Sequence, residues 1–228
     1  MDIRLYYTDD GQGEPLILLH GNGESGAYFR NQIEYFSKTR RVIAIDTRGH
    51  GGSPKGTEPF TLSTFVDDLH GFMWRHNIPR ADILGFSDGG NIALMFAMKY
   101  PSNVNRLILN GANLHFSGLT VKTAAEILGG YIKYCITAPF SKYAAHKKAL
   151  YRLMVAEPKI RAEELRFITA PTLVIVGDHD MIRAAHSRRI AGSIPNCKLV
   201  TISGDHFIAA KNPDAFNKAV EDFLNGGR

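Results

Sequence analysis

The chain contains 228 residues, of which 44% are hydrophobic and 21% are charged, and it carries a formal net charge of +5. These values are ordinary for a globular domain with one sizeable core, and they exclude a disordered chain. No apolar run approaches the ~18 residues of a membrane-spanning helix. We therefore expect one domain over residues 1–228, located in the cytoplasm, with no membrane partner.

The positive charge is concentrated in residues 116–168, which contain nine Lys or Arg and four Asp or Glu and so account for the whole net charge. No nucleic-acid-binding module accompanies this segment. A basic, solvent-facing surface is therefore favoured over a nucleic-acid partner. The two cysteines, Cys135 and Cys197, have no metal-ligand spacing, which is typical of a reduced chain. We expect a monomer or a small homo-oligomer.

Short apolar runs alternate with helical patterns along most of the chain. The expected strands lie at residues 4–7, 15–19, 42–45, 81–84, 104–109, 171–176 and 198–202. The expected helices lie at residues 28–37, 62–76, 91–100, 184–191 and 214–224. This alternation predicts an α/β fold with a mostly parallel sheet covered by helices on both faces. Residues of about 116–168 break the alternation, and their helical patterns predict a short helical cap inserted between two strands.

A glycine-rich sequence at residues 85–90, GFSDGG, separates an expected strand from an expected helix. A serine in such a turn is exposed at the helix N-terminus, and glycines two positions before and after it let strand and helix approach closely. The free N–H groups at a helix N-terminus favour an oxygen that becomes negative during a reaction. The pattern predicts Ser87 as a nucleophile, with an ordinary glycine-rich loop and an N-capping serine as the alternative.

Two further polar residues, Asp180 and His206, follow expected strands, and ligands of an open α/β sheet bind at the carboxyl ends of its strands. A serine hydroxyl needs a base, and the base needs an acid that fixes its tautomer. His206 as the base and Asp180 as the acid complete the chain order Ser, Asp, His that is typical of a nucleophile elbow. Asp178 competes for the role of the acid, because it lies closer to the strand end, but it could instead cap the turn.

The run Asp178-His179-Asp180 also looks like a metal cluster. Contiguous residues do not readily converge on one ion, and this spacing fits no standard site. We therefore expect no metal, and no cofactor is implied.

Several motifs, in order along the chain, resemble those of the α/β-hydrolase superfamily of serine hydrolases. HGNG at residues 20–23 resembles its oxyanion loop, and DTRGHGGS at residues 46–53 resembles the turn after the next strand. GDHD at residues 177–180 and GDH at residues 204–206 resemble the acid and base motifs. The resemblance covers nearly the whole chain and implies an α/β-hydrolase fold with a short helical cap.

Within this superfamily, the chain is similar to the biphenyl-hydrolase-like (valacyclovir hydrolase) branch. The similarity rests on GFSDGG at residues 85–90, followed by Tyr100-Pro101 and by NGAN at residues 110–113. This resemblance implies α-amino esters as one class of substrate.

The resemblance also implies the surroundings of the nucleophile. Two main-chain N–H groups, those of Asn22 and Asp88, would form the oxyanion hole. His20 is expected to pack and hydrogen-bond beneath the oxyanion loop. The charged residues of the turn at 46–53 are expected to be structural, because they lie one strand farther from the serine.

Aromatic residues are candidates for the wall of the substrate pocket, with plain packing as the alternative. Phe86 lies beside the nucleophile in the sequence and is a candidate substrate-binding residue. The cap contributes Phe116, Tyr131 and Tyr134. Trp74 is expected to pack in the core or against the cap.

We expect a serine hydrolase that cleaves a small carboxylic ester through an acyl-enzyme, so its partner is a small-molecule ester. Similar triads catalyse C–C bond, lactone or thioester hydrolysis and cofactor-free perhydrolysis, because the fold sets the triad and the cap sets the substrate. A slow-turnover ligand-sensing protein is the alternative from another class.

The side chain of Asp88 raises a separate question. A carboxylate beside the reacting centre would repel the developing oxyanion, by about 3 kcal/mol at ~5–6 Å and an effective dielectric constant of about 20. Three explanations are open: a substrate ammonium neutralises it, a Lys or Arg of the basic cap does so, or the carboxylate turns toward solvent. We expect the first explanation, which makes Asp88 a substrate-binding residue, so that Asp88→Asn selectively lowers kcat/KM for α-amino esters.

Overall fold

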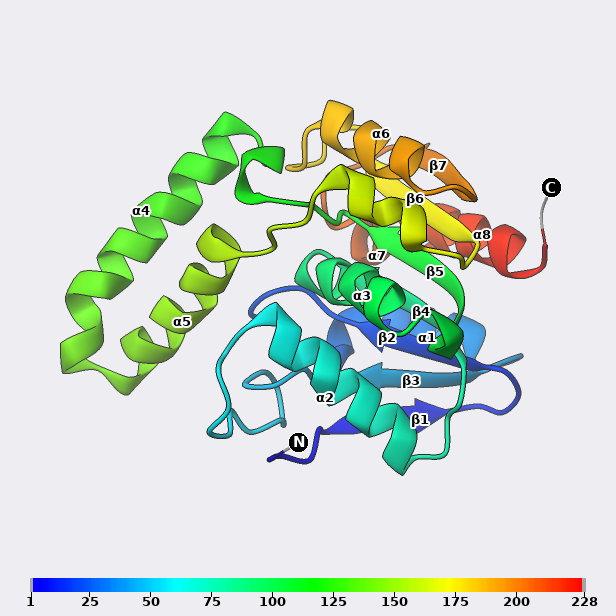
Figure 1. Ribbon diagram of the computed structural model, residues 1–228, viewed down its shortest axis with the longest axis horizontal. Helices are drawn as coiled ribbons and strands as arrows, with labels where there is room; N and C mark the ends of the chain where they lie inside the picture. The colour runs from blue at the N-terminus through cyan, green and yellow to red at the C-terminus, as the bar shows by residue number, and fades with distance from the viewer. Residues whose placement is uncertain (1, 227–228) are drawn as a thin grey trace.

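The computed structural model describes residues 2–226, and in this part of the chain seven strands form one sheet in the order β1-β3-β2-β4-β5-β6-β7 (Figure 1). The strands are β1 (Tyr7–Asp10), β2 (Pro15–Leu19), β3 (Arg41–Ile45), β4 (Ala81–Phe86), β5 (Val104–Asn110), β6 (Thr172–Gly177) and β7 (Cys197–Ile202). The edge strand β1 is antiparallel to β3, and the other neighbouring strands are parallel. The expected α/β-hydrolase fold class is confirmed.

The central strands are continuous apolar runs because both faces of the sheet are covered. Side chains along a strand alternate between the two faces, and β2 shows the result. Leu16 and Leu18 belong to one hydrophobic core, whereas Ile17 and Leu19 belong to the other. Each parallel strand therefore contributes to two cores at once.

Helices from both halves of the chain cover the two faces. The helices α1 (Arg30–Phe36) and α8 (Pro213–Leu224) pack on one face. The other face is covered by α2 (Leu62–Arg75), α3 (Asp88–Lys99) and α6 (Ala184–Ser193). A short helix, α7 (Ile208–Lys211), precedes α8, and a 3₁₀ turn at Gly26–Phe29 precedes α1. No helix in the described residues is both long and apolar enough to cross a bilayer.

The first strand differs from the sequence expectation of residues 4–7. The ladder of β1 pairs Tyr7 with Ile45 and Asp10 with Val42, so the strand begins where the expected one ends. Ile3 and Leu5 are buried without joining the sheet. The polar residues at positions 8–10 are compatible with a strand here because β1 is an edge strand that leaves most of its side chains outside the core.

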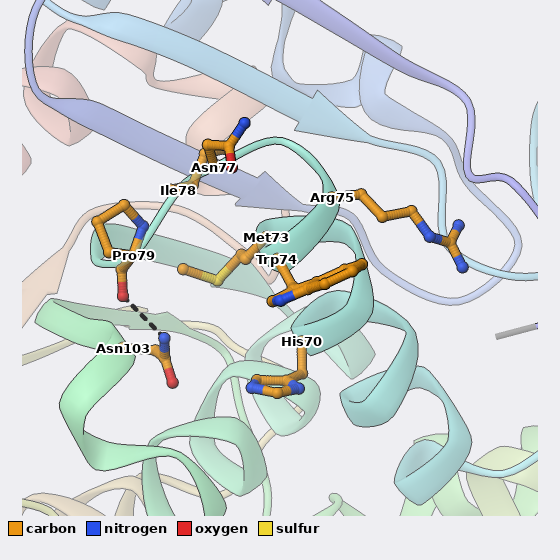
Figure 2. A pocket seen from close by; sticks show the side chains of 8 residues that line it. All are labelled: His70, Met73, Trp74, Arg75, Asn77, Ile78, Pro79 and Asn103. Carbon is orange, nitrogen blue, oxygen red and sulfur yellow. Dashed lines mark hydrogen bonds between the residues drawn. The ribbon is translucent and has the colours of Figure 1, made fainter.

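Trp74 also differs from its expected packing role, because its side chain is 77% exposed. The buried face of α2 carries Phe65, Leu69 and Phe72 at helical spacing, and position 74 falls on a different face. Trp74 instead lies beside a surface cavity of about 650 Å³ near the C-terminal end of α2, with His70 close by (Figure 2).

The cap lies between β5 and β6 and consists mainly of a helical hairpin, α4 (Val121–Thr137) and α5 (Lys142–Ala156). Three 3₁₀ turns complete it, at Phe116–Gly118, Ala138–Phe140 and Ala162–Phe167. Both helices begin at a hydroxyl N-cap, since Thr120 accepts from the N–H of residue 123 and Ser141 from that of residue 144. The hairpin projects from the carboxyl ends of the parallel strands, with α5 nearer the sheet and α4 outermost (Figure 1).

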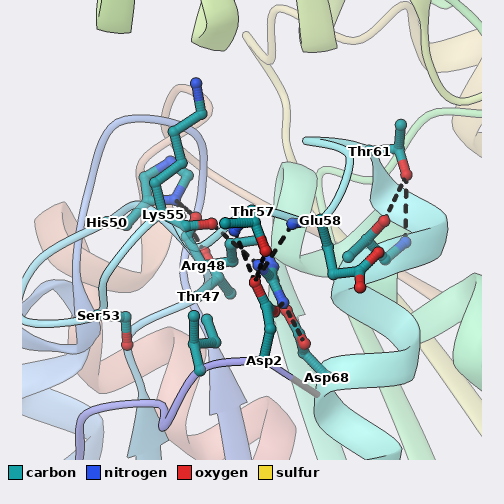
Figure 3. A network of polar contacts seen from close by, with 12 residues as sticks. Asp2, Thr47, Arg48, His50, Ser53, Lys55, Thr57, Glu58, Thr61 and Asp68 are labelled. Atoms are coloured by element: carbon teal, nitrogen blue, oxygen red, sulfur yellow. Dashed lines mark hydrogen bonds and ion pairs between the residues drawn. The ribbon is translucent and has the colours of Figure 1, made fainter.

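A buried ion-pair network holds the turn after β3 (Figure 3). The fully buried guanidinium of Arg48 donates two hydrogen bonds to Asp68, at 2.7 and 2.8 Å, and a third to Asp2 at 2.6 Å. It also donates to the Lys55 carbonyl oxygen at 2.9 Å. One side chain therefore joins the N-terminus, helix α2 and the loop after β3, which is a structural role.

Arg48→Ala should lower the free energy of unfolding by about 3–5 kcal/mol, because it leaves the buried Asp68 carboxylate without its partner. Urea denaturation followed by circular dichroism measures the change. The control is Arg41→Ala, which removes a partly exposed ion pair with Asp9 and should cost about 1 kcal/mol or less. Equal losses in the two variants would contradict the anchoring role of Arg48.

Candidate active site

Ser87 lies in the turn between β4 and α3 with backbone angles of φ 53° and ψ −118°. A positive φ is costly for a residue with a side chain. Close packing imposes it here: a Cβ on Gly85 would lie 2.2 Å from the Gly89 carbonyl oxygen, and a Cβ on Gly89 would lie 2.0 Å from that of Leu19. The Ser87 N–H also donates to the Asn110 carbonyl oxygen at 2.8 Å. Strand β4 and helix α3 can therefore meet only through a sharp turn at the serine.

The structure brings His206 and Asp180 together. The Nδ1–H of His206 donates to Asp180 Oδ1 at 2.7 Å, and both side chains are almost fully buried. The same carboxylate oxygen accepts from the Ile182 N–H at 2.9 Å. This contact fixes the imidazole tautomer, so Nε2 carries the free lone pair. Nε2 is buried and makes no hydrogen bond with any residue in the range 2–226.

Asp178, the competing acid, lies elsewhere. Its Oδ1 accepts from the Gly204 N–H at 2.9 Å and from His179 Nδ1 at 2.7 Å. The hydrogen bond from Gly204 and then that from His179 lower the pKa of Asp178. Its side chain is exposed and joins the turn after β6 to the turn after β7, whereas Asp180 contacts His206.

The imidazole of His206 lies close to the serine turn. Its ring centroid is 4.8 Å from that of Phe86, the residue before Ser87. In the sheet, Phe86 is paired with Asn110, and Gly111 follows Asn110. A Cβ on Gly111 would lie 2.5 Å from His206 Cε1. The base candidate therefore lies beside the turn that carries the nucleophile candidate, and its Nε2 makes no hydrogen bond with Ser87 in this structure.

Phe86 does not lie at a pocket wall, in contrast to the sequence expectation. Its side chain is only 1% exposed and stacks on Tyr28, with ring centroids 4.3 Å apart and an interplanar angle of 5°. As the last residue of β4, it points into the core formed with α1 and α8. Phe86 packs against the His206 ring and is a packing residue.

The two residues of the expected oxyanion hole are joined by their side chains. Asn22 Nδ2 donates to Asp88 Oδ2 at 2.9 Å and to the Leu150 carbonyl oxygen of the cap at 3.2 Å. Asp88 is the first residue of α3, so its N–H has no acceptor within the helix. The oxyanion loop, the N-terminus of α3 and the cap helix α5 therefore meet at Asn22.

His20 lies beneath this loop. The Thr47 N–H donates to its Nε2 at 3.0 Å, so Nδ1 is protonated and donates to the Gly21 carbonyl oxygen at 2.7 Å. Burial lowers the pKa of His20, which favours this neutral form. The buried ring fixes the start of the oxyanion loop against the turn after β3.

The Asp88 carboxylate is surrounded by amide groups. It is 8% exposed, and its second oxygen accepts from Asn91 Nδ2 at 3.3 Å. Asn91 is held in turn by Asn113, whose N–H donates to Asn91 Oδ1 at 2.8 Å. Burial raises the pKa of Asp88. The expectations of a cap Lys or Arg partner and of a solvent-facing carboxylate are therefore wrong for the residues that the structure describes.

Glu24 is a site residue that the sequence reasoning missed. Its Oε2 accepts from the Gly21 N–H at 3.2 Å, so the side chain folds back over the oxyanion loop. Burial raises the pKa of Glu24 to about 7, although the hydrogen bond from Gly21 and the nearby His206 lower it. The only sequence signal is the spacing. Glu24 directly follows the HGNG loop, three residues after Gly21, and its carboxylate accepts the hydrogen bond from the Gly21 N–H.

In the described part of the chain, no group of three or more His, Cys, Asp or Glu side chains is arranged to hold a metal ion. The polar groups of the site instead form hydrogen-bonded pairs in which a base has one free nitrogen. This arrangement is suited to proton transfer at Ser87.

A family model described as the alpha/beta hydrolase fold matches residues 14–155, more than half of the chain. The chain belongs to the alpha/beta-hydrolase family. Its matched region contains the oxyanion loop, the serine turn and most of the cap, whereas Asp180 and His206 follow it.

Relatives of this family member differ in the activities that their names state. The magnesium-chelatase 30 kDa subunit of Rhodobacter capsulatus is 29% identical and is aligned over 96% of this chain and 89% of its own. 3-Oxoadipate enol-lactonase 2 of Acinetobacter baylyi is 27% identical, with coverages of 96% and 92%. The solved structure of Est816, described as an N-acyl homoserine lactone degrading enzyme, has a TM-score of 0.81 at 25% identity and 97% coverage of each chain. Family membership supports a hydrolase without naming the bond that is cleaved.

Glu24 makes stability depend on pH. Its pKa is raised in the fold, from 4.5 to about 7, so its stabilising contribution is complete below about pH 4.5 and is lost as the pH rises through about 7. Glu24→Gln should remove this slope, so that the variant gains stability relative to the original chain at about pH 8. Urea denaturation at several pH values measures both curves. Glu34→Gln, an exposed change on α1, should leave the slope unchanged, and an unchanged slope in Glu24→Gln would contradict the prediction.

Proposed function

We propose that this chain is a serine hydrolase that cleaves small carboxylic esters through an acyl-enzyme. The observation that carries the proposal is the buried hydrogen bond between His206 and Asp180, which leaves His206 Nε2 free beside the strained turn at Ser87. A histidine held in one tautomer next to a serine at a helix N-terminus is the arrangement that general-base activation of a hydroxyl requires.

In the proposed reaction, Ser87 Oγ attacks the ester carbonyl carbon while His206 Nε2 takes the hydroxyl proton. Asp180 orients the ring and stabilises the imidazolium through Nδ1–H. The N–H groups of Asn22 and Asp88 bind the oxyanion of the tetrahedral intermediate. His206 then returns the proton to the departing alcohol, which leaves an acyl group on Ser87. Water, deprotonated by His206, releases the acid and restores the hydroxyl.

Lactones are the second substrate class that we propose, because a lactone is a cyclic carboxylic ester and reacts by the same steps. Two relatives support it through their names, which state an enol-lactonase and an enzyme that degrades N-acyl homoserine lactones. The cap decides between open-chain and cyclic esters, since the triad is common to both.

Ser87→Ala should abolish ester hydrolysis and labelling by a fluorophosphonate probe while the protein stays folded, because the hydroxyl acts at a turn and not in the core. Turnover of a panel of activated esters and lactones, together with gel detection of the label, measures both effects. Hydrolysis by Ser87→Ala at a rate near that of the original chain would contradict the nucleophile assignment. A stoichiometric burst of alcohol without steady turnover would favour the slow ligand-sensing protein.

Asp88 has a role in this proposal that does not require a substrate cation. Both of its carboxylate oxygens accept hydrogen bonds from amide groups, those of Asn22 and Asn91. These donors answer the electrostatic question, because the two N–H dipoles point at the carboxylate and partly offset the negative potential that it produces at the oxyanion. Asp88 is then a positioning residue that holds the Asn22 N–H in the oxyanion hole, and recognition of an α-amino ester by Asp88 is the competing proposal.

A double-mutant cycle separates the two roles of Asp88. Asp88→Ala should lower kcat by ~10–100-fold on an α-amino ester and on its matched uncharged ester alike, because the misplaced oxyanion loop serves both. Asn22→Ala keeps the main-chain N–H of residue 22 but loses the same hydrogen bond to Asp88. The double variant should therefore lower kcat little more than either single variant does. A loss confined to the amino ester would instead support recognition of an ammonium group by Asp88.

A further inference from the structure

Helix α4 of the cap is an outer helix with an unusual surface. None of its 17 residues is buried, yet one face carries a row of large aliphatic side chains. Val121 is 84% exposed, Ile132 is 60% exposed and Ile136 is 66% exposed, with Leu128 between them. Their spacing of about one or two helical turns places them in one line, which we call the α4 stripe (Val121, Ala125, Leu128, Ile132 and Ile136).

The stripe does not face the rest of the chain. The side of α4 that meets α5 is defined by Gly130, where an added Cβ would lie 2.1 Å from the Tyr151 ring, and by Tyr134, whose ring centroid is 5.3 Å from that of Tyr151. On a helical projection these two positions lie roughly opposite Val121 and Ile132. The α4 stripe therefore points away from α5, and helix α4 itself lies at the outer edge of the molecule (Figure 1).

An exposed, contiguous aliphatic face of this kind marks a contact surface. The helix ends beside Phe140, which is 87% exposed and extends the apolar surface past the last turn of α4. With a rise of about 1.5 Å per residue, the stripe is about 25 Å long. A matching helix of the same length would cover it from end to end.

The charges along α4 indicate which partner fits. Lys122, Glu126 and Lys133 lie on one edge of the stripe, because they are separated by four and seven residues. Helices that lie on anionic membranes carry many Lys and Arg on the polar face, whereas α4 carries two lysines and one glutamate. An edge with both signs of charge is complementary to a reversed copy of itself.

We propose that two copies of this chain associate through their α4 stripes, with the two helices antiparallel about a two-fold axis near Leu128. In this arrangement Val121 lies near the partner's Ile136, and Lys133 lies within about one turn of the partner's Glu126. A two-fold contact makes both ion pairs at once, because each copy offers the same edge. The contact buries on the order of 1,000 Å² in total, which is the lower end for a specific interface and predicts micromolar affinity.

Sedimentation equilibrium from about 1 to about 100 μM tests the proposal, over a range that brackets a micromolar dissociation constant. The original chain should shift from the mass of one chain toward twice that mass. Ile132→Glu places a charge in the centre of the stripe at an exposed position, so it should remain folded by circular dichroism and stay monomeric. A monomer for the original chain at the highest concentration would overturn the proposal.

Charge reversal tests the antiparallel register. Lys133→Glu should weaken association at least ~10-fold, because it faces the partner's Glu126 with a like charge. The double variant Glu126→Lys and Lys133→Glu restores opposite charges and should return the affinity to within ~3-fold of the original. Lys38→Glu changes the net charge by the same amount far from the cap and should have no effect. Unchanged association of Lys133→Glu would overturn the register.

A vesicle experiment distinguishes a lipid surface from a second copy. Vesicles of phosphatidylserine and phosphatidylcholine are sedimented with the original chain and with Ile132→Glu. We expect no cosedimentation of the original chain at physiological ionic strength. Cosedimentation that Ile132→Glu abolishes, in a chain that stays monomeric in solution, would assign the stripe to a membrane surface and overturn the proposed dimer.

Discussion

The backbone of Ser87 is the constraint on which the site depends. A left-handed conformation at a residue with a side chain costs of order 1–3 kcal/mol, and the two hydrophobic cores around β4 and α3 offset that cost. The conformation persists because Gly89 lies against the Leu19 carbonyl, where no Cβ would fit. Helix α3 is thereby held against the end of β2, which brings its N-terminus beside the loop that starts at His20. The geometry of the oxyanion hole and that of the nucleophile are thus consequences of the same close approach.

Two carboxylates, the buried Asp88 and the partly buried Glu24, lie in the surroundings of the proposed oxyanion and have raised pKa values. Neither has an ionic partner among the described residues, and both accept hydrogen bonds from neutral N–H groups instead. Neutral donors position a carboxylate without placing a fixed positive charge next to the reacting atoms. The site therefore holds both carboxylates by hydrogen bonds from neutral groups, and the N–H groups that would bind the oxyanion lie among these same hydrogen bonds.

The sequence predicts those features that are local. Ser87, Asp180 and His206 each follow a strand, and position at a strand end is readable from apolar runs and glycines. One of the two partners of Asp88 is not local, because Asn22 is 66 positions away in the sequence. Helix phase explains the error at Trp74, because an apolar residue near the end of a helix packs only if it falls on the buried face. The sequence does not predict the orientation of Phe86 either, because the last residue of a strand can face the core or the pocket.

The hydrogen bond between Asn22 and the Leu150 carbonyl oxygen links the cap to the proposed oxyanion hole. The cap helix α5 is bonded to the loop that would bind the oxyanion. A displacement of α5 would break that bond and leave the Asn22 side chain held by Asp88 alone. The position of the cap and the geometry of the proposed oxyanion hole are therefore coupled through one amide group.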